Sequence, residues 1–427
     1  MKIKDGVYGL VVADALGVPV EFESREYLKE NPVKEMLGYG TYNQPPGTFS
    51  DDSSMTLATI DALSQSIDTI DYERIMEAFS RWLRNGEYTP HGKTFDVGNT
   101  THNAISNYIS GEEALNCGED YERANGNGSL MRILPIAYYI NELHHNREKE
   151  FIYEIIENLS GLTHAHSISK IACVFYVEFI ISMLNKDKDF EYHLDYAIDN
   201  IKRYYKNNHY LNKFDRILTK EIINLPESEI SSSGFVLSTL EAVIWCLFNS
   251  ESYKEAVLKA VNLGNDTDTV GAICGAAAGI YYGYKDIPEE WIGEIANIEL
   301  VDDLCYDFEL AIHNQQITNI CQFTDYFENA DETSYEIISG NITEPFGHVE
   351  YDKEIYMFYN VLIENNYLGN LRKEYCEENI KTATTSDIKE VLTDIIKREQ
   401  SCKNSYRRAI KEKKFYKILT RLNELRR

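Results

Sequence analysis

The sequence predicts an all-α protein over its first 310 residues, followed by a smaller, mostly helical segment. Apolar residues recur at helical spacing through most of the chain, and the alternation that is typical of strands is scarce. Small residues also form stripes at every third or fourth position, from Gly6 to Gly17 and again from Gly271 to Gly283. Such stripes let helix backbones approach closely, so we expect a tightly packed helical core.

Amphipathic patterns predict the individual helices of the first 312 residues. They lie at about 55–67, 71–84, 100–110, 129–143, 149–158, 166–184, 192–206, 235–249 and 253–262. From about residue 313 the composition becomes mixed and polar, and further helices are expected near 351–366, 386–400 and 403–426. Ser386 is the expected N-cap of the second of these, with Asp387 and Glu390 in its first turn. We therefore divide the chain into a helical domain at 1–312 and a C-terminal helical module at 313–427.

The charge balance restricts the partners of the protein. The chain has a net charge of -27, which opposes attraction to nucleic acid or to an anionic membrane over most of the surface. The last segment, 401–427, is the exception, because it contains ten Lys or Arg against two Asp or Glu. Nucleic acid or an acidic protein is therefore a partner to consider only for this basic helix, and the alternative is a packed helix with a solvated basic face.

The sequence favours a cytoplasmic protein without a membrane partner. The apolar run from Val270 to Tyr284 is about 15 residues long, which is shorter than the roughly 20 that a spanning helix needs. The eight Cys include no C-x-x-C pair, so reduced thiols are the simplest interpretation. The sequence does not indicate an oligomeric state.

Two acidic, hydroxyl-bearing segments precede helical patterns. In the first, "GTFSDDSSMT", Ser50 before Asp51 and Asp52 fits an N-cap and first turn, which is the structural alternative to a metal site. In the second, "GNDTDTVG", Asp266 and Asp268 are two positions apart. Residues at this spacing cannot share a helix face, so both carboxylates converge only if this piece is a loop or a frayed first turn.

If the two segments meet, they offer only hard oxygen donors. Such donors suit magnesium or manganese and argue against zinc or copper. Four carboxylates would offset the charge of two divalent cations, and without cations they would repel one another strongly. The candidate ligands are Ser50, Asp51, Asp52, Asp266, Asp268 and Thr269.

Six segments in order resemble the ADP-ribosylglycohydrolases, the family of dinitrogenase-reductase-activating glycohydrolase. They are "GLVVADALGVPVEF", "PPGTFSDDSSM", "FDVGNTT", "GNGSLMRILPIA", "LTHAHS" and "GNDTDTVGAICGAAAGIYYG", and they cover about residues 1 to 300. The resemblance implies an all-α orthogonal helical bundle with two Mg²⁺ or Mn²⁺ ions bound by the six oxygen donors above. Phe49, Ser50 and Asn265 depart from the usual Trp, Thr and Gly. Asn265 is expected to preserve the turn, because Asn tolerates a left-handed backbone.

The resemblance also implies catalytic carboxylates. Glu21 matches the glutamate that enters the site in relatives as general base or ribose contact, and its alternative is a surface carboxylate at a helix end. Asp96 matches an aspartate proposed as base or guanidinium partner, since a carboxylate can accept two parallel hydrogen bonds from a guanidinium. Its alternative is a cap for the helix that starts near Thr100.

A glycine-rich segment and one histidine complete the predicted substrate site. Residues 125–132, "NGNGSLMR", form a loop that is expected to open a helix and to receive the pyrophosphate through its amides and dipole, although a simple Asn-Gly turn explains the pattern too. The residues concerned are Asn127, Gly128, Ser129 and Met131. His164 matches the family histidine near the phosphates or adenosine; a satisfied structural histidine is the alternative, and His166 stays unassigned.

The expected reaction is hydrolysis at the anomeric carbon of an ADP-ribosyl adduct. Because "FDVGNTT" is present, the favoured substrate is ADP-ribosylated arginine on protein, with free ADP-ribose as the corresponding ligand. Alternative substrates are O-linked adducts, namely modified serine or O-acetyl-ADP-ribose, and ADP-ribosylated nucleic acid. A non-catalytic ADP-ribose-binding or structural protein is the alternative of another class. The presence of all six oxygen donors disfavours it.

Overall fold

A computed structural model describes residues 2–338, 348–369, 377–402 and 404–426. The chain divides into two compact units. Unit 1 comprises residues 1–138 and 148–309, and unit 2 comprises residues 139–147 and 310–427. The boundary expected at 312/313 placed residues 139–147 in the first domain, whereas in the structure they belong to unit 2 with the C-terminal part of the chain.

Unit 1 is built from helices, as the periodicity predicted, and residues 2–309 form no paired strand. Its helices are α1 (Ile3–Gly17), α2 (Arg25–Glu30), α3 (Asp51–Gln65), α4 (Tyr72–Asn85), α5 (Asn99–Ile109), α7 (Lys149–Gly161), α8 (Ser167–Asn185), α9 (Phe190–Tyr204), α10 (Asp215–Leu218), α11 (Val236–Phe248), α12 (Tyr253–Val261), α13 (Thr267–Tyr282) and α14 (Glu289–Ile292). Helices α6 (Leu134–Leu143) and α15 (Ile298–Cys321) contribute residues to both units.

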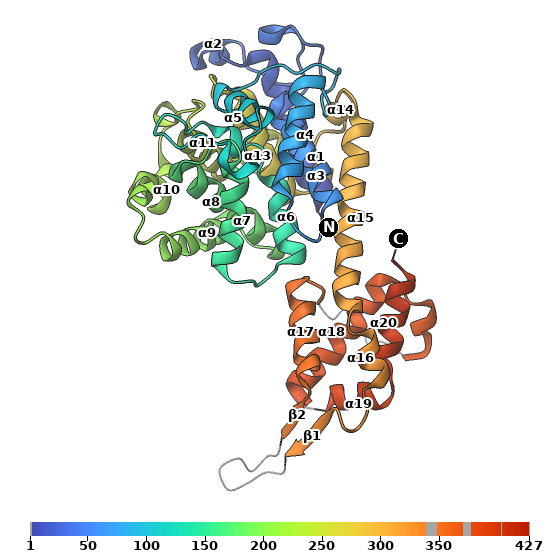
Figure 1. The fold of residues 1–427 in the computed structure, drawn as a ribbon. Coiled ribbons are helices and arrows are strands. Elements are labelled where there is room, and N and C mark those ends of the chain that lie inside the picture. The colour runs from blue at the N-terminus through green and yellow to red at the C-terminus, as the bar shows by residue number, and fades with distance from the viewer. Residues whose placement is uncertain (1, 339–347, 370–376, 403, 427) are drawn as a thin grey trace. The chain divides into compact units, whose positions relative to one another are not determined.

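The centre of unit 1 is the packing of α1 against α13, which lie side by side in Figure 1. The two stripes of small residues face each other there. A Cβ atom added at Gly9 would lie 2.2 Å from the carbonyl oxygen of Gly275, and one added at Gly279 would lie 2.1 Å from that of Asp5. At the end of α1, a Cβ at Gly17 would lie 2.3 Å from the Cα of Asp268. The absence of side chains at these positions therefore brings the start of α13 against the end of α1.

Within the part of the chain that the structure describes, one helix, α8, is long and apolar enough to cross a membrane by length and composition alone. The protein buries 83% of its most apolar window, as expected for the core helix of a globular unit. The apolar run from Val270 to Tyr284, which is too short to span a bilayer, largely coincides with the buried helix α13.

Unit 2 has its own apolar core, which includes Phe323, Phe358, Leu392, Phe415 and Ile418. Its elements are α16 (Thr324–Asn329), the antiparallel strands β1 (Tyr335–Ile338) and β2 (His348–Tyr351), α17 (Lys353–Glu364), α18 (Thr385–Cys402), α19 (Ser405–Lys411) and α20 (Lys414–Glu424). The β1–β2 pair is a feature that the helical prediction missed.

Two predictions in unit 2 were wrong. Thr384, not Ser386, precedes α18, where its hydroxyl accepts the amide of Asp387 while the carboxylate of Asp387 accepts the amide of Thr384. The basic segment is two helices, α19 and α20, separated at Lys413, which adopts a left-handed backbone with φ 53°. The apolar face of the segment is buried, with Phe415 1% exposed and Ile418 and Leu422 0% exposed.

Candidate metal and substrate site

The first acidic segment caps a helix and also faces a shared buried cluster. Ser50 is the N-cap of α3, and its hydroxyl accepts the amide of Asp52 at 3.2 Å. Asp51 and Asp52 form the first turn, where the helix dipole favours negative charge. The interpretation of this segment as a helix cap is therefore correct. It does not exclude a metal site, because the Asp52 carboxylate is also completely buried.

The second acidic segment converges with the first. Asp266 is the N-cap residue of α13 with a non-helical backbone, and Asp268 lies in the first turn, as the spacing of the two carboxylates required. Asn265 adopts the left-handed backbone that was expected of it, with φ 62°. The hydroxyl of Thr269 donates to Asp52 Oδ2 at 3.3 Å, so the two segments, more than 200 positions apart in the sequence, meet at this point.

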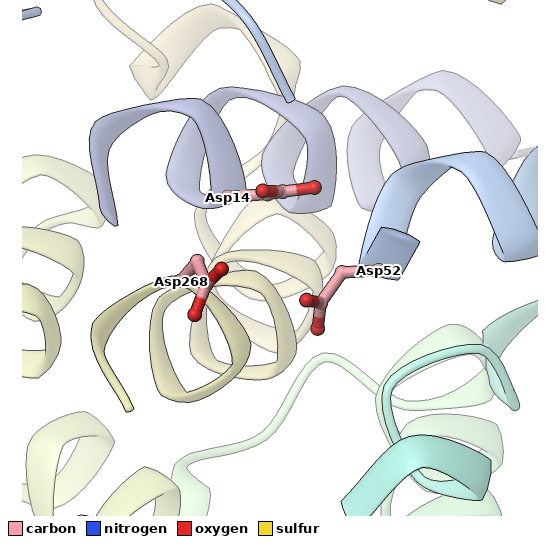
Figure 2. A group of neighbouring side chains, drawn as sticks. All are labelled: Asp14, Asp52 and Asp268. Carbon is pink, nitrogen blue, oxygen red and sulfur yellow. The ribbon is translucent and has the colours of Figure 1, made fainter. Parts of the chain in front are cut away.

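Two groups of carboxylates have oxygen atoms within 4.8 Å of one another. The first consists of Asp14, Asp52 and Asp268, which extend from α1, α3 and α13 into the same space in Figure 2. The second consists of Glu21, Asp266 and Asp268. Asp268 is therefore common to both groups. Asp51 belongs to neither group, although it lines the cavity described below.

Asp14 is a member of this cluster that sequence reasoning missed. Its carboxylate accepts the backbone amides of Ser50 and Ser53 at 3.0 Å and also the hydroxyl of Ser53. These bonds tie the start of α3 to α1. A signal was present in the sequence, since Asp14 is a charged residue within the otherwise apolar run "GLVVADALG".

Burial makes the ionised form of these carboxylates costly without a counter-charge. Burial raises the pKa of Asp14 to about 7 and that of Glu21 to about 9, and the nearby carboxylate of Asp96 adds to the rise for Glu21. The pKa values of Asp51, Asp52 and Asp268 are also raised well above the ordinary range, first by burial and then by neighbouring carboxylates. A divalent cation would supply the missing positive charge.

The donor set fits a hard divalent cation. Asp52 Oδ1, Asp266 Oδ1, Asp268 Oδ2 and Glu21 Oε2 are buried oxygen atoms without a hydrogen-bond partner among the described residues. Buried polar atoms normally have a partner, so these oxygens are free to bind a ligand. Their neighbours are hydroxyl oxygens of Ser50 and Thr269, and neither group contains a nitrogen or sulfur donor.

A cavity of about 360 Å³ opens beside the acidic groups. Most of the residues that the sequence predicted for the site contribute to its wall. These are Glu21, Asp51, Asp96, Asn127, Gly128, Met131, His164, Asp266 and Thr269. The buried Ser50, Asp52 and Asp268 are not part of the wall. Phe22, which no pattern singled out, lines the cavity with a 69% exposed ring and a positive φ of 66°.

Asp96 is not a helix cap. The N-cap position of α5 is Gly98, so the capping alternative is excluded. Asp96 instead adopts a positive φ of 52° and accepts the hydroxyl of Tyr42 at 2.6 Å. Tyr42 keeps its proton, because burial and this carboxylate raise the pKa of its phenol. Asp96 and Glu21 both line the cavity, and the phenol of Tyr42 is a hydrogen-bond donor to Asp96.

The glycine-rich loop differs from the expectation. Helix α6 begins only at Leu134, and Asn127–Ser129 form a single 3-10 turn, so no long helix directs its dipole at the cavity from this loop. Asn127 contributes through its side chain, which donates to Asp266 Oδ2 at 2.8 Å and to the hydroxyl of Thr239 at 2.9 Å. Ser129 is completely buried behind the wall, where its hydroxyl accepts that of Ser160.

The two histidines of "LTHAHS" have separate positions. His164 is buried at the cavity wall, and its Nδ1 lies 2.8 Å from the hydroxyl of Thr163. Burial, followed by the charge of Arg132, lowers the pKa of His164 to about 3, so the ring is neutral. His166 is the N-cap of α8, where Nδ1 accepts the amide of Ile168.

The fold and the site define an all-α protein with a buried, all-oxygen acidic centre next to a polar cavity. The chain belongs to the ADP-ribosylglycohydrolase family, whose model matches residues 1–318, and it is therefore an ADP-ribosyl glycohydrolase enzyme. This finding confirms the resemblance and the all-α class.

Relatives of known activity support the assignment. An ADP-ribosylarginine hydrolase, Tri1, of Serratia proteamaculans is 30% identical over 71% of this chain and 77% of its own length. The ADP-ribosyl-[dinitrogen reductase] glycohydrolase of Rhodospirillum rubrum is 28% identical over 67% of this chain and 87% of its own. A solved structure of an ADP-ribosylglycohydrolase-related protein complex superposes with a TM-score of 0.58 at 26% identity, covering 72% of this chain and 96% of the other.

Proposed function

We propose that this enzyme removes ADP-ribose from modified arginine on protein, with two Mg²⁺ or Mn²⁺ ions held by its acidic groups. The observation that carries the proposal is the position of Asp96 at the same cavity as the buried carboxylates. A carboxylate at this place can accept paired hydrogen bonds from a guanidinium. The similarity to an ADP-ribosylarginine hydrolase points to the same substrate class.

The ions would be held where the unpartnered oxygens lie. When bound there, divalent cations would supply the positive charge that orients the ribose diol and offsets the charge that develops as the glycosidic bond loosens. The residues that we assign to them are Ser50, Asp51, Asp52, Asp266, Asp268 and Thr269. The side-chain amide of Asn127 donates a hydrogen bond to the carboxylate of Asp266. The carboxylate of Asp14 accepts the backbone amide of Ser50.

The protein supplies the proton transfers through Glu21 and Asp96. Hydrolysis takes one proton from water and returns one to the leaving guanidine nitrogen, so no net proton is consumed. Glu21, whose pKa is raised to about 9 by burial and by Asp96, is suited to hold that proton in transit. Asp96 Oδ1 accepts the Tyr42 hydroxyl, and because each carboxylate oxygen can accept more than one hydrogen bond, both oxygens can still accept the paired donors of a guanidinium.

A substrate panel tests this function. The enzyme is incubated with protein carrying ADP-ribose on arginine or on serine, with O-acetyl-ADP-ribose and with ADP-ribosylated nucleic acid, each with Mg²⁺ or with EDTA. We expect release of ADP-ribose from the arginine adduct only, and only with Mg²⁺. Asp51→Asn and Asp268→Asn should each lower this turnover at least about 100-fold.

Undiminished turnover in both variants would refute the metal assignment. Faster release from an O-linked adduct than from the arginine adduct would refute the substrate. Binding of ADP-ribose without release from any member of the panel would instead favour a non-catalytic function.

A further inference from the structure

A buried arginine lies behind the cavity wall, and no ion pair joins it to a carboxylate among the described residues. Arg132 is 0% exposed, and its Nη2 donates to the carbonyl oxygen of Leu159 at 3.1 Å and to Oγ1 of Thr163 at 2.9 Å. The guanidinium carbon lies 4.8 Å from the centre of the Phe79 ring. Its Nε and Nη1 have no hydrogen-bond partner among the described residues. Burying a cation in this way is costly, so a specific function for the charge is to be expected.

Thr163 connects this arginine to the cavity. Guanidinium N–H groups only donate, so Thr163 Oγ1 is the acceptor in its contact with Arg132. The same oxygen lies 2.8 Å from Nδ1 of His164. No other acceptor for the Thr163 hydroxyl proton is found among the described residues. The hydroxyl therefore donates to Nδ1, and neutral His164 carries its own proton on Nε2.

His164 lines the cavity, and its Nε2 lies on the side of the ring away from Thr163, next to the glycine-rich loop. A Cβ atom added at Gly128 would lie 2.9 Å from Cε1 of the ring, and one added at Gly126 would lie 3.3 Å from Nε2. The two glycines therefore leave room for this edge of the imidazole beside the loop. Nδ1, by contrast, is directed at Thr163. An anionic oxygen in the cavity would thus meet an N–H donor and not a ring lone pair.

We propose that Arg132 and Thr163 are positioning residues that hold His164 in its Nε2–H tautomer, as a permanently neutral donor to the pyrophosphate of the substrate. The proposal rests on the proposed function for the identity of the anion. The proposal explains why a guanidinium is buried at this place. Its positive charge also disfavours a second proton on the imidazole ring of His164. His164 then binds through a hydrogen bond that does not depend on pH in the physiological range, and it takes no part in proton transfer.

Spectra of the histidine side chains in the full-length enzyme test the proposal. With ¹⁵N-labelled histidine, two-bond ¹H–¹⁵N correlations distinguish the two tautomers, and His164→Gln identifies the signals of His164 by their loss. We expect wild-type His164 to show protonated Nε2 and unprotonated Nδ1, without change between about pH 5 and pH 8. Thr163→Ser should preserve this pattern. Thr163→Val should produce a mixture of tautomers, and Arg132→Met should do the same if it folds.

Binding of free ADP-ribose, measured by calorimetry with Mg²⁺, is the second measurement. Thr163→Val should weaken binding by the reciprocal of the fraction of His164 that keeps its proton on Nε2, about twofold for an equal mixture of tautomers, because the donor to a charged oxygen is lost in the rest of the population. Thr163→Ser should restore it. Thr59→Val is the matched control, since Thr59 is equally buried but its hydroxyl donates only to the carbonyl of Met55 within α3. It should change neither measurement.

Wild-type His164 with its proton on Nδ1 would overturn the proposal. Thr163→Val with an unchanged tautomer and unchanged ADP-ribose affinity would overturn it as well. Failure to hydrolyse the arginine adduct would overturn the proposed function alone, because the spectra and the binding of free ADP-ribose decide the role of Arg132 and Thr163 independently.

Discussion

At the scale of single residues, Asp14 shows how a carboxylate can position the residues of the proposed metal site without being one of the assigned ligands. Its oxygens accept the amides of Ser50 and Ser53 and the hydroxyl of Ser53. These contacts fix the turn that directs Asp52 into the cluster shown in Figure 2. Partners that orient metal ligands commonly affect metal affinity almost as much as the ligands do.

Asp14→Asn is expected to lower kcat/KM for the arginine adduct about 10- to 100-fold and to weaken Mg²⁺ binding, because an amide presents only one acceptor oxygen to these donors. Titration of activity with Mg²⁺ measures both effects. Asp5→Asn is the matched control on the same helix, as Asp5 lies at the other end of α1 and accepts only the amide of Tyr284 among the bonds described. Equal activity of wild type and Asp14→Asn would contradict this role.

Individual site residues were predictable where a short segment carries its own chemistry. Ser50 with Asp52, and Asp266 with Asp268, are recognisable as helix starts rich in oxygen donors. Tyr42 was not predictable, because its importance comes from a contact with Asp96, and Thr163, although it is next to His164 in the sequence, gains its importance from a contact with the distant Arg132. A hydroxyl in the sequence does not reveal its partner across the fold.

At the scale of secondary-structure elements, the contact between α1 and α13 positions the site. Gly9 and Gly275 allow the two backbones to touch, and Gly17 allows Asp268 to approach the end of α1. Helices are rigid over this length, so a separation imposed anywhere along the contact would displace Asp268 relative to Asp14 and Asp52.

Gly9→Ala is expected to destabilise the protein by about 3 kcal/mol, since its Cβ would lie 2.2 Å from the backbone oxygen of Gly275, which cannot rotate away. Urea unfolding measures the loss, and Mg²⁺ affinity should fall with it. Gly161→Ala is the control, because Gly161 is also in a helix but its Cβ would meet only the flexible Lys170 side chain, at 3.5 Å. A similar effect of both substitutions would argue against the close contact.

The helices themselves were largely predictable from periodicity, and their ends were less so. The expected patterns at 71–84 and 253–262 correspond to α4 and α12 within one residue. The pattern at 129–143 was extended too far, because Gly126 to Ser129 belong to a turn that pairs with Gly234. The break at Lys413 was missed because lysine does not signal a left-handed backbone.

At the scale of the whole molecule, the chain connects its two units more than once. Residues 139–147 belong to unit 2, where Gln316 donates to Glu142 and the amide of His145 donates to the carbonyl of Glu364. A boundary placed by composition at 312/313 cannot detect such a return, because it depends on contacts between residues distant in sequence. Truncation of the chain after residue 312 would therefore remove the partners of 139–147 along with the C-terminal helices.

Because several carboxylates are buried, the free energy of unfolding of the metal-free protein should depend on pH. The folded-state pKa is raised to about 9 for Glu21 and is raised well above the ordinary value for Asp52 and Asp268. In the unfolded chain these groups titrate near their ordinary values. At pH values between the unfolded-state pKa and the folded-state pKa of such a group, the folded state binds more protons than the unfolded state. The free energy of unfolding must therefore fall as the pH rises through this range.

We expect Glu21 alone to lower the unfolding free energy of the metal-free enzyme by up to about 1.4 kcal/mol per pH unit as the pH rises from about 7 toward 9, and the raised pKa values of Asp52 and Asp268 to act in the same direction. This window avoids the buried His144 and His164, whose lowered pKa values act in the opposite direction at lower pH. Thermal unfolding in EDTA and in excess Mg²⁺ at several pH values measures the effect. Mg²⁺ should raise the Tm more at pH 9 than at pH 7, since the deprotonated carboxylates bind it. Asp268→Asn should flatten the EDTA profile, whereas a wild-type profile that rises with pH would show that these carboxylates are ionised without metal.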